Sequence, residues 1–224
     1  MAPAALLAET MRSLSVLLLL ALGLCLAACA ELHSSPGVIP ASASDWREVA
    51  TSDDRERLRD WRDAFVSALR AARAAGHSPA IAAEGALLEP DAALPGPAIP
   101  NGDYRCRVTK LGAKTVGLLD YVAYPPFICR IAPQQGGQSL TKLTGSQRYV
   151  GLIMPSDALR QVFLGTLVLG DETRALRYGL DRERDVAGFV ERIGPNRWRM
   201  LMPRPHFESQ IDVMELVPNS QDMR

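Results

Sequence analysis

The side chains with the clearest potential for chemistry are two cysteines, Cys106 and Cys129, each in a short run of apolar and basic residues. Two such cysteines form a structural disulfide, remain buried thiols, or act as a redox pair. Redox pairs commonly have the spacing C-x-x-C, which these residues lack. The spacing therefore favours a structural disulfide over a redox site.

The same two runs contain three arginines, Arg105, Arg107 and Arg130. Because alternate residues of a β-strand face opposite sides, each cysteine shares its face with the apolar residues two positions away, and the arginines fall on the other face. A row of guanidinium groups can bind carboxylates, phosphates or an acidic partner protein through paired hydrogen bonds. The alternative is a solvated strand face whose arginines pair with neighbouring acidic residues.

Aromatic residues and one histidine complete the candidate sites. Tyr121, Tyr124 and Phe127 surround a Pro-Pro pair, where they form either an aromatic lip for a ligand or a packed loop. His206, with Glu208 nearby, is a candidate general base, but the nucleophile motif G-x-S-x-G is absent. We therefore assign no catalytic residue.

Several classes of function are excluded by what the sequence lacks. It has no paired histidines, zinc motif or calcium loop, and no glycine-rich phosphate loop, so we expect no metal and no cofactor. Lys and Arg number 25 and are balanced by 25 Asp and Glu, with the two signs interspersed. This balance argues against a nucleic-acid partner.

The N-terminus is typical of a targeting segment. Residues 14–26 are almost wholly apolar but too short to span a bilayer, and Arg12 precedes them. The start is either Met1 or Met11. The run Leu-Ala-Ala-Cys that ends at Cys29 resembles the lipobox of bacterial lipoproteins, which implies cleavage after residue 28 and lipidation of Cys29.

We therefore expect a lipid anchor in the outer membrane, facing the periplasm, because the residue after Cys29 is not Asp. An ordinary cleaved signal and a soluble periplasmic protein are the alternative. Cys25 is lost with the signal and Cys29 is lipidated, which leaves Cys106 and Cys129 as a pair in an oxidising compartment, where disulfides persist.

The mature chain divides into segments of different composition. Residues 29–44 carry the lipidated cysteine and a flexible tether, 45–101 form a helical lead and a Pro-rich connector, 102–218 form a β domain, and 219–224 are a tail. The helical lead has an apolar stripe and ends at Gly76; its members are Leu58, Trp61, Phe65, Ala68, Leu69 and Ala72. A second short helix is expected from Ser78 to Gly85.

Short strands separated by Gly and Pro turns fill the β domain. The expected strands are 103–110, 127–132, 139–144, 147–154, 160–169, 174–179, 186–193, 196–203 and 210–217. We predict an α+β fold that is mainly β, an amphipathic helix followed by a small antiparallel barrel, or a sandwich, of about eight strands.

Three sequence runs resemble a family of exported Gram-negative proteins that carries a domain of unknown function. They are Gly-Asp-Tyr-Arg-Cys-Arg from 102, Tyr-Pro-Pro-Phe-x-Cys-Arg from 124, and the ending 211–218. The resemblance covers about residues 45–218 and implies no catalytic residue. A looser likeness, in architecture alone, is to small exported barrel inhibitors of metalloproteases.

Taken together, these patterns favour a non-enzymatic binding or envelope-interaction protein. Its expected partners are the membrane, through the lipid anchor at Cys29, and an unidentified envelope protein or a small anionic ligand. A small periplasmic hydrolase that uses His206 is the first alternative, and a barrel-type protease inhibitor is the second.

Overall fold

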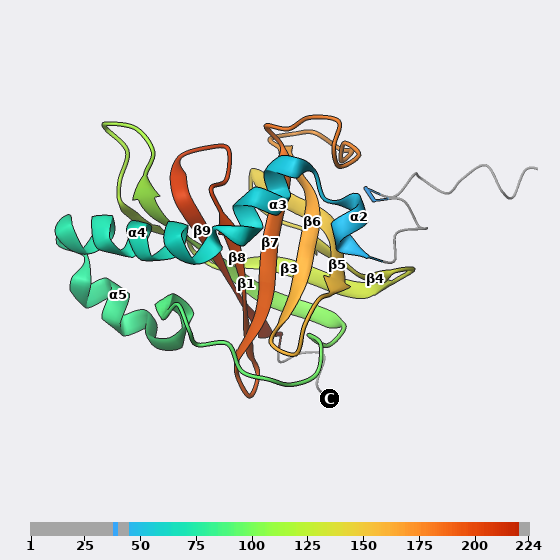
Figure 1. Cartoon of the computed structure of the whole chain (residues 1–224), viewed down its shortest axis with the longest axis horizontal. Helices are drawn as coiled ribbons and strands as arrows, with labels where there is room; N and C mark the ends of the chain where they lie inside the picture. The colour runs from blue at the N-terminus through green and yellow to red at the C-terminus, as the bar shows by residue number, and fades with distance from the viewer. Residues whose placement is uncertain (1–37, 40–44, 220–224) are drawn as a thin grey trace, which may run out of the picture. The chain divides into compact units, whose positions relative to one another are not determined.

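The strands of this chain close into an antiparallel barrel (Figure 1). The computed structural model describes residues 38–39 and 45–219. Nine strands are present: β1 Gly102–Ala113, β2 Tyr121–Ala123, β3 Phe127–Gln134, β4 Gly137–Lys142, β5 Gln147–Pro155, β6 Arg160–Leu169, β7 Asp185–Gly194, β8 Arg197–Pro203 and β9 Ser209–Pro218. Strands β3 to β9 pair in sequence order, and β1 pairs with both β3 and β9. Eight strands thus form a closed barrel, which confirms the predicted fold class, and β2 is an extra strand beside the end of β1.

The disulfide joins the first two strands of the barrel. Cys106 on β1 and Cys129 on β3 are bonded, with Cα atoms 5.9 Å apart, and neither is exposed to solvent. In the register of the two strands, Cys129 lies opposite Tyr104 and Cys106 lies opposite Phe127. The predicted disulfide is therefore present, and neither cysteine is available for redox chemistry as a free thiol.

The barrel interior is filled by the alternate residues that the sequence pattern predicts. Tyr104, Cys106 and Val108 of β1 face inward and pack with Trp198 and other apolar residues of the opposite wall. The other face of the same strands points outward. The alternation that was expected to bury the cysteines is therefore confirmed.

A pair of glycines makes room for the Phe163 ring in this core. Gly151 of β5 and Gly165 of β6 lie opposite each other, and both face the Phe163 ring. A Cβ atom added at Gly165 would lie 2.4 Å from the Val150 carbonyl oxygen and 2.6 Å from the Phe163 ring. The strands can approach this closely only because neither position has a side chain.

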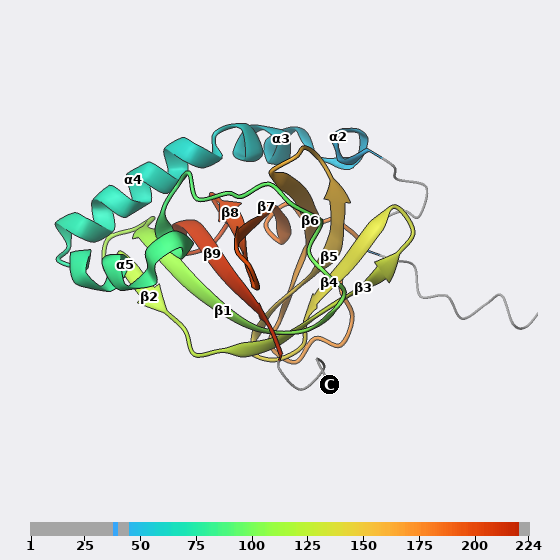
Figure 2. The same ribbon diagram turned by 90° about the horizontal axis from the view of Figure 1, so that it is seen from below.

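Helices cover one side of the barrel wall (Figure 2). They are α2 Trp46–Val49, α3 Ser52–Arg59, α4 Trp61–Ala74, α5 Ser78–Glu84 and the 3₁₀ helix η2 Gly85–Leu88. The apolar stripe of α4 packs with residues from the outer faces of β1, β8 and β9. Leu58 of α3 packs instead with a cluster from the outer faces of β5, β6 and β7.

The helical lead differs from the single helix that the apolar stripe predicts. It is interrupted at Asp60, whose backbone leaves the helical conformation between α3 and α4. Trp61, at the junction, packs against both outer clusters. The interruption lets the two helices follow different parts of the curved barrel wall.

One predicted strand is wrong. Residues 174–179 form no strand, because this segment is held as a loop by Tyr178. The Tyr178 hydroxyl donates to Asp54 and accepts from the Thr51 amide at 3.0 Å. The Tyr178 amide in turn donates to the carbonyl oxygen of Val38 at 3.0 Å.

The predicted signal peptide and Cys29 lie outside the described residues, as does all of the predicted tether except residues 38–39. Ile39 is buried in the outer cluster that contains Leu58. In the part of the chain that the structure describes, no helix combines the length and apolar character needed to cross a membrane.

Candidate functional site

A cavity of about 400 Å³ opens at one end of the barrel. It lies where β1 and β4 end and β3 and β5 begin, and we call it the barrel mouth. The residues that line it are Val108, Lys110, Tyr124, Phe127, Lys142, Gly145, Ser146, Gln147, Tyr149 and Glu208. Small closed barrels commonly bind ligands in such a mouth.

Lys110 is the first of two inward-facing lysines in the barrel mouth, and acidic residues neutralise its charge. Its Nζ lies 2.8 Å from an Asp212 carboxylate oxygen and 3.2 Å from a Glu208 carboxylate oxygen. Burial alone would lower the pKa of Lys110, but the two carboxylates outweigh burial and raise the pKa above its ordinary value.

The same Asp212 carboxylate is held by two hydroxyl groups. Tyr149 donates to it at 3.2 Å, and Ser209 donates to its other oxygen. Burial and the nearby charge of Asp212 raise the pKa of Tyr149 well above its ordinary value, so the hydroxyl keeps its proton. Lys110 and the two hydroxyl groups are therefore all bonded to Asp212 within the chain.

Lys142 is the second inward-facing lysine, and its surroundings are different. It is 3% exposed, and its Nζ donates to the carbonyl oxygens of Thr144 at 3.0 Å and Gln147 at 2.7 Å. The Nζ also lies 3.6 Å from the centre of the Phe127 ring. Among the described residues, no carboxylate forms an ion pair with it.

Burial is the main cause that lowers the pKa of Lys142 to about 8, with Arg148 and Lys110 adding repulsion. The Lys142 amine, which is charged when protonated and has no carboxylate partner among the described residues, thus lines the cavity. An arrangement of this kind can bind an anion or, when deprotonated, act as a nucleophile.

The structure brings two of the three predicted lip residues together. Tyr124 and Phe127 line the barrel mouth. Tyr121 does not, because its hydroxyl donates to Glu84 at 3.2 Å and its ring stacks on His77. The aromatic lip therefore consists of Tyr124 and Phe127 alone in this structure.

The predicted arginine row lies on the outer wall of the barrel, away from the mouth. Arg107 contacts Glu84 of α5 at 2.6 Å and Glu215 of β9 at 2.9 Å, and these carboxylates raise the pKa of Arg107. Arg130 pairs with Asp103 at 2.6 Å. Arg105 is exposed. Anion binding by these residues stays a prediction, with two of the three already paired to acids of the chain.

His206 lies on the loop between β8 and β9. Its ring packs edge-on against Phe207, and its Nε2 atom lies 3.6 Å from Glu183. Its neighbour in sequence, Glu208, instead pairs with Lys110. His206 lines a small recess of about 20 Å³ beside the barrel mouth, and its role as a base also stays a prediction.

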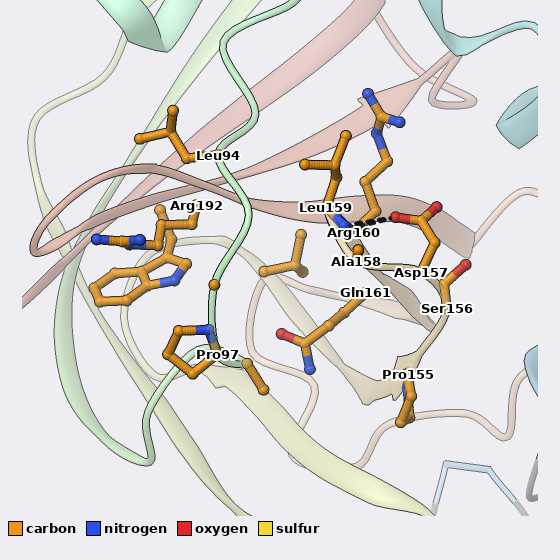
Figure 3. A pocket seen from close by; sticks show the side chains of 14 residues that line it. Leu94, Pro97, Pro155, Ser156, Asp157, Ala158, Leu159, Arg160, Gln161 and Arg192 are labelled. Carbon is orange, nitrogen blue, oxygen red and sulfur yellow. Dashed lines mark hydrogen bonds between the residues drawn. The ribbon is translucent and has the colours of Figure 1, made fainter.

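A second cavity, of about 230 Å³, lies at the opposite end of the barrel. Figure 3 shows Leu94 and Pro97 of the connector across the cavity from Leu159 of the β5–β6 turn and Gln161 of β6. Its two arginines have partners: Arg160 contacts Glu191 at 2.6 Å, and Arg192 donates to the carbonyl oxygens of Gly194 and Pro95. Among the described residues, the lining arginine Arg160 is paired with a carboxylate, whereas Arg192 and Asp157 are bonded to backbone groups.

The residues that sequence reasoning missed are the polar groups inside the barrel mouth. Lys110 continues the inward series of β1, and Lys142 lies two residues after buried Leu140 on β4. The period-two alternation, carried to the end of each strand, would have placed both lysines inside.

A family model matches residues 46–216, from the first residue of α2 to near the end of β9, and is described as a domain of unknown function, DUF4893. The chain belongs to the DUF4893 family. The DUF4893 domain thus includes the barrel, its helices and the mouth. The curated proteins and the solved structures give no match to this chain.

Proposed function

We propose that this DUF4893 chain is a binding protein that takes a small molecule into the barrel mouth. The observation that carries the proposal is the cavity of about 400 Å³, which has an aromatic lip and two inward lysines at the end of a closed barrel. Ligand sites are commonly concave, largely apolar, and supplied with a few polar groups that fix orientation.

We further propose that the domain works outside the cytoplasm, attached to the outer membrane through a lipid on Cys29 and facing the periplasm. The apolar segment 14–26 and the lipobox-like run that ends at Cys29 support this location. The disulfide between Cys106 and Cys129 also supports it, since disulfides persist mainly in oxidising compartments.

Binding is favoured over catalysis because the hydroxyl groups and the histidine near the mouth are bonded to other partners. Ser209 and Tyr149 both donate to Asp212, and His206 contacts Glu183 and Phe207. Among the described residues, no hydroxyl or thiol is hydrogen-bonded to His206. A nucleophile and base pair would need that contact.

The proposal is tested with N-phenyl-1-naphthylamine, a neutral aromatic probe whose fluorescence increases in apolar sites. We expect saturable binding of one probe per chain. Ser146→Trp fills the barrel mouth from its exposed rim and should weaken binding by about tenfold or more. Leu143→Trp adds the same side chain at an exposed position outside the cavity and should leave binding unchanged. Equal binding by both variants, or no saturable binding to the wild type, would contradict the proposal.

A further inference from the structure

The two lysines in the barrel mouth differ in one respect that bears on the ligand. Lys110 is paired with Asp212 and Glu208, whereas Lys142 contacts only neutral groups, two carbonyl oxygens and the Phe127 ring. A buried charge without a counter-ion is costly to the folded state. An anion that enters the mouth would therefore compensate the charge of Lys142.

The contacts of Lys142 offset part of the cost of burying its charge. An ammonium group has three N–H donors, and the carbonyl oxygens of Thr144 and Gln147 take two of them. The Nζ also lies 3.6 Å from the centre of the Phe127 ring, whose π-face attracts a cation and would repel the lone pair of a neutral amine, while the third N–H remains for an incoming acceptor. This arrangement favours ion pairing over nucleophilic chemistry at Lys142.

Gly145 leaves space for the end of the Lys142 side chain. A Cβ atom at this position would lie 2.8 Å from the Lys142 Nζ and 2.8 Å from the Phe127 ring. Its φ of +90° is also one that residues with a side chain rarely adopt. The turn from β4 to β5 can bring its backbone this close to the ammonium group because Gly145 has no side chain.

From these observations we infer that the ligand of the barrel mouth is a small amphiphilic anion. Its acidic head pairs with Lys142, and its apolar body lies against Tyr124 and Phe127. This inference rests on the proposed function and adds the chemical class of the ligand. It also locates the anion site inside the barrel and not on the outer arginine row.

The test compares two probes that share one skeleton. 8-Anilinonaphthalene-1-sulfonate carries a sulfonate group, and N-phenyl-1-naphthylamine lacks it. We expect the sulfonate to bind the wild type about tenfold more tightly than the neutral probe. Lys142→Met removes the charge at similar length and should abolish this preference, with neutral-probe affinity retained within about twofold.

Arg105→Met is the matched control, since it removes an exposed cation of the outer wall and should leave both affinities unchanged. If neither probe binds the wild type, the proposed function fails. If the neutral probe binds but the sulfonate is not preferred, or its preference survives Lys142→Met, only the inference fails. A loss caused by Arg105→Met would assign the anion site to the outer row and overturn the inference.

A pH series on the wild type keeps the test independent of how the variant folds. Lys110 and Tyr149 have raised pKa values, and Asp212 and Glu208 form ion pairs with Lys110. Lys142, with its pKa of about 8, therefore loses its proton before Lys110 and Tyr149 do as the pH rises. Sulfonate affinity should fall as the pH rises above 8, with neutral-probe affinity constant; parallel behaviour of both probes would overturn the inference.

Discussion

Lys142 has a measurable influence on the folded protein even without a ligand. Its pKa is lowered from 10.5 to about 8, chiefly by burial. Below pH 8 the lysine is charged in both the folded and the unfolded state, and burial of the charge destabilises the folded state. Between pH 8 and 10.5 the folded protein releases the proton while the unfolded chain retains it. The free energy of unfolding therefore rises with pH through this window.

A comparison of the wild type with Lys142→Met isolates this contribution. The difference in unfolding free energy should shift in favour of the wild type by about 2 kcal/mol between pH 7 and pH 10. Urea denaturation at several pH values measures the shift, because effects of other titrating groups are common to both proteins. A difference that does not change with pH would mean that Lys142 keeps an ordinary pKa in the folded state.

At the scale of residues, the sequence predicted the disulfide and the faces of its strands but not the polar interior of the mouth. The cysteines could be assigned because few are available and alternation places each on an apolar face. Lys110 and Lys142 were missed because a lysine near a strand end is normally exposed, although the alternation of β1 and β4 places both on the inward face. The arginines could not be assigned because their partners, such as Glu84, come from distant parts of the sequence.

At the scale of elements, the close pairing of β5 and β6 depends on the two facing glycines. The Phe163 ring lies over them in the barrel core, and the strand backbones leave no space for a methyl group at Gly165. These two strands also form part of the wall that α2 and α3 cover on the outside. A distortion here would therefore affect both the inner and the outer packing.

Gly165→Ala should lower the unfolding free energy by about 3 kcal/mol, because the added carbon must displace backbone as well as the Phe163 ring. Gly194→Ala is the matched control in β7, where the nearest atom to an added Cβ is the Arg197 Cβ at 3.3 Å. It should cost less than about 1 kcal/mol. Chemical denaturation of both variants measures the difference, and similar losses would show that the glycine pair is not a close-packed contact.

The strands that the sequence predicts well are those that are long and have a clear alternation of apolar and polar residues. Long alternating strands such as β6 and β9 were found with nearly correct bounds. The three-residue strand β2 is too short to show a period, and 174–179 has the composition of a strand but is fixed as a loop by Tyr178. The break between α3 and α4 does not interrupt the apolar stripe, so it follows from the curved surface beneath the helices.

At the scale of the whole molecule, Arg199 connects the barrel to the segment that leads into it. It is fully buried on the outer side of β8 and forms two hydrogen bonds to Glu191, at 2.9 and 2.7 Å. It also donates to four backbone carbonyl oxygens, those of Ala86, Leu87, Glu89 and Pro90. One side chain therefore fixes η2 and the start of the Pro-rich connector against the wall.

Arg199→Met should destabilise the protein by about 3–5 kcal/mol, since it leaves four carbonyl oxygens and part of Glu191 without their buried donor. Arg197→Met, two residues away on the same face, removes a partly exposed partner of Glu215 and should cost about 1 kcal/mol or less. Urea denaturation gives the energies. Limited proteolysis should cleave Arg199→Met faster between residues 85 and 101, and unchanged cleavage there would contradict the connecting role.

The pairing of β1 with β9 sets the order in which the barrel can be completed. Strand β1 pairs with β3 on one side and with β9 on the other, so the barrel can close only after β9 has been made. The disulfide between β1 and β3 needs only the first strands, and its short loop can close long before. In a chain that emerges N-terminus first, the disulfide can therefore form before the mouth is complete. The mouth needs Glu208 and Asp212, which come later in the chain.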